Sequence, residues 1–149
     1  MKNNDLEIAK RRLKQKGLTL SIVKNGEVVF ETASRGISGF LEAVEKFGET
    51  LNGSSVADKV VGKAIALLCV DAKVKAVYAV VLSEKAREIL WKYTVQHEWE
   101  RLVEKILAPN KAEICPFEKL ADELENPAEA YARFKALQNK LKGAADEKA

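Results

Sequence analysis

Charged residues interrupt an otherwise apolar stretch of the chain at residues 55–70. These residues are Asp58, Lys59 and Lys63, and Gly62 lies between the two lysines. On a helix, Lys59, Gly62 and Lys63 share one face, because residues three and four apart are neighbours. Lysines in a first turn oppose the positive end of the helix dipole, so an anion held by lysines and free N–H groups would explain them. The alternative is an exposed helix edge whose lysines reach water, with Asp58 as a cap.

A second group contains a cysteine and a glutamate around a proline. Cys115 precedes Pro116, and Glu118 follows two residues later, which is the pattern of a helix start with a thiol in place of the usual capping hydroxyl. Thiols at helix N-termini ionise readily and act as nucleophiles or metal ligands. The alternative is a small buried side chain beside a capping glutamate. His97, the one histidine, is either a nucleophile-activating partner of Cys115 or a surface residue among acids.

Turn residues and hydrophobic periodicity predict the elements that position these groups. Asn25-Gly26 between two alternating runs predicts a β-hairpin, because both turn residues must take positive φ. The Ser-x-x-Asp pattern at 55–58 is typical of a capping box and predicts a largely buried helix over 55–70, with Cys69 in the core. The continuous apolar run at 74–82 predicts a buried parallel strand, and Ser83 predicts the cap of the next helix.

The remaining elements complete an α/β pattern. We predict an extended piece at 94–96 and helices at 4–16, 40–47, 84–93, 99–107, from 116, and 127–141. A hairpin followed by alternating helices and strands favours a layered α/β sandwich with a mixed sheet.

Composition favours a single soluble domain in the cytoplasm. The 149 residues suffice for one core, no apolar run approaches the ~20 residues of a membrane span, and the polar start lacks the pattern of a signal peptide. Two cysteines do not suggest a disulfide framework. The net charge of +3 does not itself imply nucleic-acid binding, but Lys10, Arg11 and Arg12 form a basic cluster that is either a phosphate contact or a solvated helix face.

Three strings resemble the family known as domain of unknown function 1893. They lie at Ser55–Ala64, Val77–Glu84 and Ile114–Lys119, and the Asn25-Gly26 turn also matches. The resemblance covers residues 17–125, which would be the core of a single domain of residues 1–149, with terminal helices added at 1–16 and 126–149. It implies a cytidine-deaminase-like fold: an α/β sandwich whose mixed sheet is opened by a β-hairpin, with helices on both faces.

Zinc deaminases carry His-x-Glu at the start of one helix and Pro-Cys-x-x-Cys at the start of another. The resemblance places the first motif on Val56-Ala57-Asp58 and the second on Cys115–Glu118. Val56 offers no metal ligand, whereas Asp58 would occupy the general acid/base position. Because catalytic zinc takes three protein ligands, we expect a degenerate motif with no metal and no cofactor.

These patterns favour binding of a small anionic or nucleotide-like ligand between the two helix starts. The first alternative is a hydrolase or transferase that uses Cys115 or the Asp58–Lys59 pair. The second is an interaction domain that binds nucleic acid, another protein or a second copy as a homodimer. The candidate catalytic residues are Asp58, Lys59, Cys115 and Glu118. The candidate ligand-binding residues are Lys59, Gly62, Lys63 and Ser83.

Overall fold

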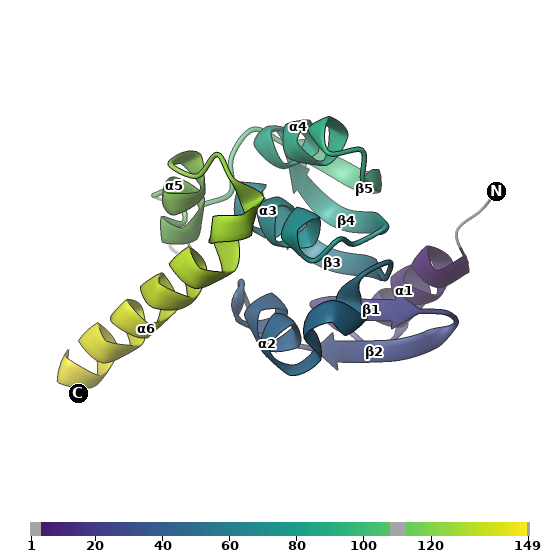
Figure 1. Cartoon of the computed structure of the whole chain (residues 1–149), viewed down its shortest axis with the longest axis horizontal. Helices are drawn as coiled ribbons and strands as arrows, with labels where there is room; N and C mark the ends of the chain where they lie inside the picture. Colours follow the sequence, from purple (N-terminus) through teal and green to yellow (C-terminus); the bar gives the residue numbers. More distant parts are fainter. Residues whose placement is uncertain (1–3, 108–112, 149) are drawn as a thin grey trace.

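A mixed five-stranded sheet forms the centre of the computed structural model, which describes residues 4–107 and 113–148, with side chains to residue 143 (Figure 1). The strand order is β2-β1-β3-β4-β5. β1 pairs antiparallel with both β2 and β3, while β3, β4 and β5 run parallel. The strands are β1 (Leu20–Lys24), β2 (Glu27–Thr32), β3 (Ser55–Val61), β4 (Ala76–Ser83) and β5 (Gln96–Val103).

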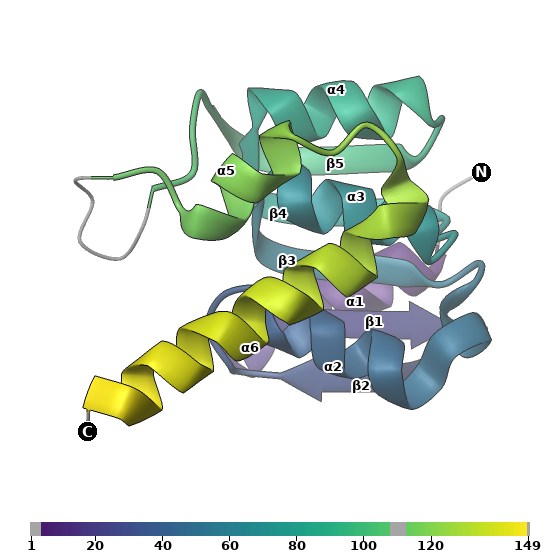
Figure 2. The same ribbon diagram turned by 60° about the vertical axis from the view of Figure 1, so that its left-hand side comes forward.

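Helices cover both faces of this sheet. One face carries only α1 (Asn4–Gln15) among the described elements, and Figure 2 shows α6 running diagonally across the opposite layer. The helices of that layer are α2 (Ser38–Phe47), α3 (Lys63–Asp71), α4 (Glu84–Lys92), α5 (Pro116–Asp122) and α6 (Ala130–Lys148). Two 3-10 turns, Gly48–Leu51 and Pro127–Glu129, precede β3 and α6. The predicted α/β fold, with a mixed sheet opened by a hairpin and helices on both faces, is confirmed.

Two apolar clusters hold the layers together. The larger lies between the sheet and α2–α6 and contains Phe40, Leu67 and Phe134. The smaller joins α1 to the other face, where Leu6 and Leu13 are almost fully buried. Fully burying such a side chain contributes roughly 1.5–3 kcal/mol, so the predicted apolar stripe of the first helix fixes α1 on the sheet.

Several local predictions are confirmed. Asn25 and Gly26 have φ values of 52° and 80°, as the hairpin requires. The buried run at 74–82 forms β4 with both neighbours parallel to it. Ser83 Oγ accepts a hydrogen bond from Ala86 N at 3.1 Å and caps α4. The last helix begins as the 3-10 turn at Pro127 and extends as α6 to Lys148, beyond the predicted end at residue 141.

The predicted helix over 55–70 is wrong. Residues 55–61 are strand β3, and the helix begins only after Gly62. Val56, Val60 and Val61 are β-branched and favour an extended backbone, which explains the strand. Asp58 is therefore a mid-strand residue and caps no helix.

The predicted helix over 99–107 is also wrong. Residues 96–103 form β5, so the short extended piece predicted at 94–96 belongs to an eight-residue strand. Within the described ranges, no helix combines the length and apolar character needed to cross a membrane.

Candidate functional site

The carboxyl ends of the three parallel strands form the edge where most predicted site residues gather. Parallel strands end at a common edge, and here Lys63 opens α3 directly after β3 while Ser83 ends β4. Helix α5 packs beside α3 at this edge and brings Glu118 with it. The structure thus brings Lys63, Ser83 and Glu118 together, although they are far apart in the sequence.

Glu118 occupies the N-terminus of α3. Its Oε1 accepts a hydrogen bond from Lys63 N at 2.8 Å, and its Oε2 accepts one from Ala64 N at 2.8 Å. These N–H groups have no partner within their own helix, so the carboxyl group of α5 satisfies them from outside. The sequence predicted an anionic ligand at a helix that begins at 55–58, whereas the helix begins at Lys63 and its first N–H groups bind a carboxyl group of the same chain.

Gly62 makes this contact possible. A Cβ at Gly62 would lie 2.0 Å from Glu118 Oε1 and 2.4 Å from its carboxyl carbon, which is far inside van der Waals contact. The backbone of Gly62 is extended, with φ −97°, and any residue adopts that conformation. The glycine is needed for space, because a side chain would push Glu118 away from α3.

The environment of Glu118 shifts its titration. Burial raises its pKa above the ordinary value, while hydrogen bonds from the backbone N–H groups of Ala64 and Lys63 act in the opposite direction. Asp122, one turn later on α5, raises the pKa further.

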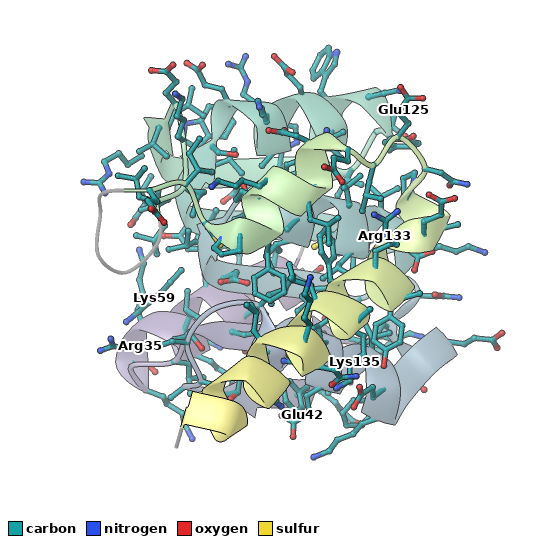
Figure 3. All side chains as sticks on the ribbon, turned by 90° about the vertical axis from the view of Figure 1, so that its left-hand side faces the viewer. Arg35, Glu42, Lys59, Glu125, Arg133 and Lys135 are labelled. Carbon is teal, nitrogen blue, oxygen red and sulfur yellow. The ribbon has the colours of Figure 1, made fainter. Side chains whose placement is uncertain are left out.

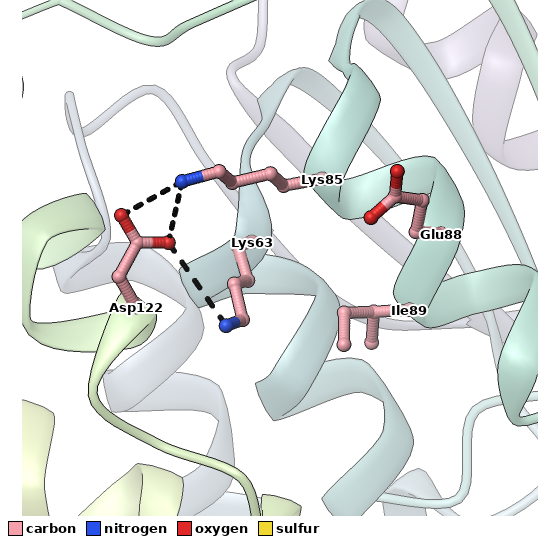
Figure 4. Close-up of a pocket in the computed structure, with 5 residues that line it drawn as sticks. All are labelled: Lys63, Lys85, Glu88, Ile89 and Asp122. Carbon is pink, nitrogen blue, oxygen red and sulfur yellow. Dashed lines mark hydrogen bonds and ion pairs between the residues drawn. The ribbon is translucent and has the colours of Figure 1, made fainter.

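A pocket of about 480 Å³ opens beside this contact. Lys63, Lys85, Glu88, Ile89 and Asp122 line it, and Figure 4 shows the carboxylate of Asp122 facing the amino groups of both lysines. Lys85 Nζ lies 2.8 Å from both Asp122 oxygens, whereas Lys63 Nζ lies 3.9 Å from Oδ1. The hydrogen bond from Lys85 to Asp122 raises the pKa of Lys85.

A smaller hollow of about 40 Å³ continues from the pocket. It shares Lys85 and Asp122 with the larger one and adds Ser83 and Glu118 to the lining. Sequence reasoning missed Lys85 and Asp122. Their signals were a lysine two residues after the capping Ser83, and an acid four residues after Glu118 and hence on the same face of α5.

Asp58 lies outside this pocket, inside the main core. Its neighbours in register across the sheet are Leu20 and Ala79, and only 9% of its surface is exposed. Burial raises its pKa to about 7, although the N–H groups of Val60 and Lys59 lower it; Val60 N donates to Oδ1 at 3.2 Å. Burial also raises the pKa of the Cys69 thiol, with a smaller contribution from the Asp58 charge, and Cys69 is a core residue as predicted.

Asp58 and Lys59 do not form one site. Successive residues of a strand point to opposite faces, so the two side chains diverge. Asp58 is buried, whereas Lys59 is exposed and lies at the periphery of the molecule in Figure 3. The geometry therefore does not support a catalytic Asp58–Lys59 pair, and the predicted placement of Asp58 at a helix start is wrong.

Cys115 precedes α5 as predicted, but its thiol makes no capping hydrogen bond to the described residues. Its N–H donates to Ile106 O at 3.2 Å rather than to Glu118, so the predicted capping box does not form. His97 lies near the other end of β5, six residues before Val103, which is roughly 20 Å along the strand. His97 Nδ1 lies 2.8 Å from Val95 O. Because Cys115 is hydrogen-bonded to Ile106, just beyond the Val103 end of β5, the distance along the strand argues against a Cys115–His97 pair.

The two thiols are expected to differ in reactivity. Cys69 is fully buried and Cys115 is half-buried. A coloured disulfide reagent should therefore modify one thiol per native chain and two in denaturant, because only ionised and accessible thiols react. Cys115→Ser should abolish the native reaction, and fast modification of Cys69 in the native protein would contradict the burial.

The amino-acid sequence matches the profile of one protein family. A family profile described as a domain of unknown function (DUF1893) matches residues 8–141. This chain belongs to that family. The match extends beyond residues 17–125 into both α1 and α6. None of the curated proteins matched the chain.

Solved structures support the shared architecture. The crystal structure of a DUF1893 protein from Thermotoga maritima has a TM-score of 0.83 and 29% identity, with 91% of each chain covered. Two forms of Acinetobacter baumannii RibD reach TM-scores of 0.46 and 0.47 at 21% and 19% identity. They cover 70% and 81% of this chain, which spans only 30% and 38% of theirs.

Proposed function

We propose that this DUF1893 protein binds a small anionic ligand, of phosphate-ester or nucleotide type, at the carboxyl edge of β3 and β4. The observation that carries the proposal is the pocket of about 480 Å³ that is lined by Lys63, the first residue of α3, and Lys85, the second residue of α4. Ligands of parallel α/β sheets bind outside the carboxyl ends of the strands, where this pocket lies.

Lys63 is the less strongly paired of the two lysines that line the pocket. Only 18% of its side chain is exposed, and among the described residues its ion-pair partner is Asp122 at 3.9 Å, which is too long for a hydrogen bond. Asp122 is instead bonded to Lys85 through both oxygens. An anion in the pocket would accept a hydrogen bond from Lys63, which Asp122 is too distant to accept, and it would share Lys85 with Asp122.

The deaminase-like placement implied by the family resemblance fits a nucleotide-like ligand, but the donor set does not fit a zinc centre. The start of α3 reads Gly62-Lys63-Ala64, without a histidine or carboxylate. Among residues 4–107 and 113–148, no group of three or more His, Cys, Asp and Glu side chains is placed to hold a metal ion. We therefore propose binding through lysines rather than through a metal.

Thermal unfolding with inorganic phosphate, a nucleoside monophosphate and the matching nucleoside tests this function. A phosphate-bearing compound at 100 times its Kd should stabilise the fold by about 2.7 kcal/mol, which raises Tm by several degrees, while the nucleoside has a smaller effect. Lys63→Ala and Lys85→Ala should each weaken binding about 10-fold or more, because each removes a charge-assisted hydrogen bond.

Lys59→Ala is the matched control, because Lys59 is an exposed lysine on β3 outside the pocket. It should leave affinity unchanged. If no phosphate compound raises Tm, or if both pocket variants bind as tightly as the unmodified protein, the proposed function is wrong.

A further inference from the structure

Strand β5 is an open edge of the sheet. In the described part of the chain it pairs with β4 alone, over eight residues with constant register and without glycine or proline. The opposite edge is less regular, since the pairing of β2 with β1 contains a shift between Ile22 and Val23. Long regular edges are templates for pairing with another chain, whereas bulges discourage it.

The charges of β5 on the α1 side are neutralised within the chain. Lys10 Nζ lies 2.9 Å from Glu98 Oε2, and Lys14 Nζ lies 2.8 Å from Glu100 Oε1. Free charges normally protect a sheet edge by repelling a second strand. Here each glutamate already has its own lysine, so that repulsion is reduced.

The α4 side of β5 exposes a row of planar side chains. Trp99 is 38% exposed. Its ring stacks with the His97 ring at a centroid distance of 5.8 Å, and the Arg87 guanidinium lies 5.4 Å from the centre of the Trp99 ring. Trp91 is 78% exposed and follows Arg87 by one helical turn, so both lie on one ridge of α4. Trp and Arg dominate binding energy at protein interfaces.

We propose that β5 pairs antiparallel with β5 of a second copy of this chain, around a two-fold axis at Trp99. This register joins the two five-stranded sheets into one, with Trp99 opposite Trp99, and His97 opposite Arg101. Glu98 then faces Glu100 of the other copy, and the lysines already bound to them, Lys10 and Lys14, complete a neutral network of four acids and four cations.

A second copy fits this edge because the register is self-complementary. A two-fold interface presents the same patch on both sides, so every contact occurs twice. Pairing one residue further along would move Trp99 away from the axis and separate it from Trp99 of the other copy. The tryptophan thus selects one register.

Sedimentation equilibrium from about 1 to 200 µM protein tests the dimer. The expected mass rises to twice the 16.5 kDa of one chain. Trp99→Lys should raise the dimer Kd about 30-fold or more, the effect of losing a hot spot of about 2 kcal/mol on each association. Trp91→Lys should also raise it, and since Trp91 is largely exposed this variant keeps the fold intact.

Val28→Lys is the matched control, because Val28 is exposed on the opposite edge strand β2. It should leave the dimer Kd unchanged. Amide hydrogen exchange of the wild type should slow in β5 at high concentration and not in β2. A monomer at 200 µM, or a dimer that both tryptophan variants leave unchanged, overturns the proposal. Tryptophan quenching by oligodeoxythymidylate in a monomeric protein would instead assign the surface to nucleic acid.

Discussion

Replacing Asp58 by asparagine is expected to stabilise the protein progressively more as pH rises from 4 to 8. Burial raises the pKa of Asp58 to about 7 in the folded state, against an ordinary value of 3.8. Between these values the unfolded chain loses the proton while the folded chain keeps it. The folded state is thus penalised by about 1.36 kcal/mol for each pH unit, which amounts to about 4 kcal/mol above pH 7.

The sign of this effect follows from the proton balance. Below pH 3.8 both states hold the proton and the group costs nothing, and above pH 7 both have lost it and the full penalty remains. Asparagine does not titrate, so its difference in unfolding free energy from wild type should grow by about 4 kcal/mol across this window. The constant part of the difference depends on how the buried amide is hydrogen-bonded, and only the pH-dependent part tests the burial of Asp58.

Urea unfolding at pH 4, 5, 6, 7 and 8 measures the difference. Glu125→Gln is the control, because it removes a carboxyl group that is exposed (labelled in Figure 3). Its curve should run parallel to that of the wild type. If the Asp58→Asn curve is also parallel, Asp58 titrates normally and the core around it is open to water.

The boundary between β3 and α3 shows why local patterns misled the prediction. Both elements are buried on nearly all sides, so residues 55–70 read as one continuous apolar segment in which neither period is visible. The Ser-x-x-Asp pattern then suggested a helix start. Gly62 and three β-branched valines before it were the signals for a strand followed by a new helix. The strand β3 was thus mistaken for the first part of α3, but the burial of the segment was predicted correctly.

Strand β5 was missed for a different reason. Its sequence alternates charged and aromatic residues, and its stability comes from pairing with β4 and from ion pairs with α1. Glu98 and Lys10 are 88 residues apart in the sequence, so no local pattern reveals their contact. The hairpin, β4 and the Ser83 cap were predictable because turn chemistry, continuous burial and capping act within a few residues.

The candidate site was predicted in part for the same reason. Ser83 was predicted at the end of a buried strand, and that order along the chain indicates the carboxyl edge. Lys63 was singled out as a lysine on a helix face, and its position just after β3 was missed. The contact of Glu118 with α3 depends instead on how α5 packs after a long connection. Glu118 was singled out for a different role, as the cap of its own helix, and its true partner lies 55 residues earlier.

Glu118→Ala and Gly62→Ala are expected to destabilise the protein by similar amounts, because each breaks the same contact. Alanine at 118 leaves the N–H groups of Lys63 and Ala64 without their acceptor. Losing these two hydrogen bonds, which also cap α3, should lower the free energy of unfolding by about 3 kcal/mol. Alanine at 62 places a Cβ where Glu118 lies, so the carboxyl group must leave α3. We expect a cost of about 2–3 kcal/mol there as well.

The double variant separates this contact from a general effect of either substitution. Once Glu118 is removed, the methyl group at residue 62 has no carboxyl group to displace, so the double variant should be about as stable as Glu118→Ala alone, with a coupling of about 2 kcal/mol. Gly143→Ala is the control, since its Cβ in α6 meets nothing within 4 Å and helix propensity predicts a gain of up to about 1 kcal/mol. Chemical unfolding measures these stabilities. If the losses of stability from the two substitutions add in the double variant, Gly62 is needed for the backbone conformation rather than for the contact, and Glu118 does not hold the start of α3.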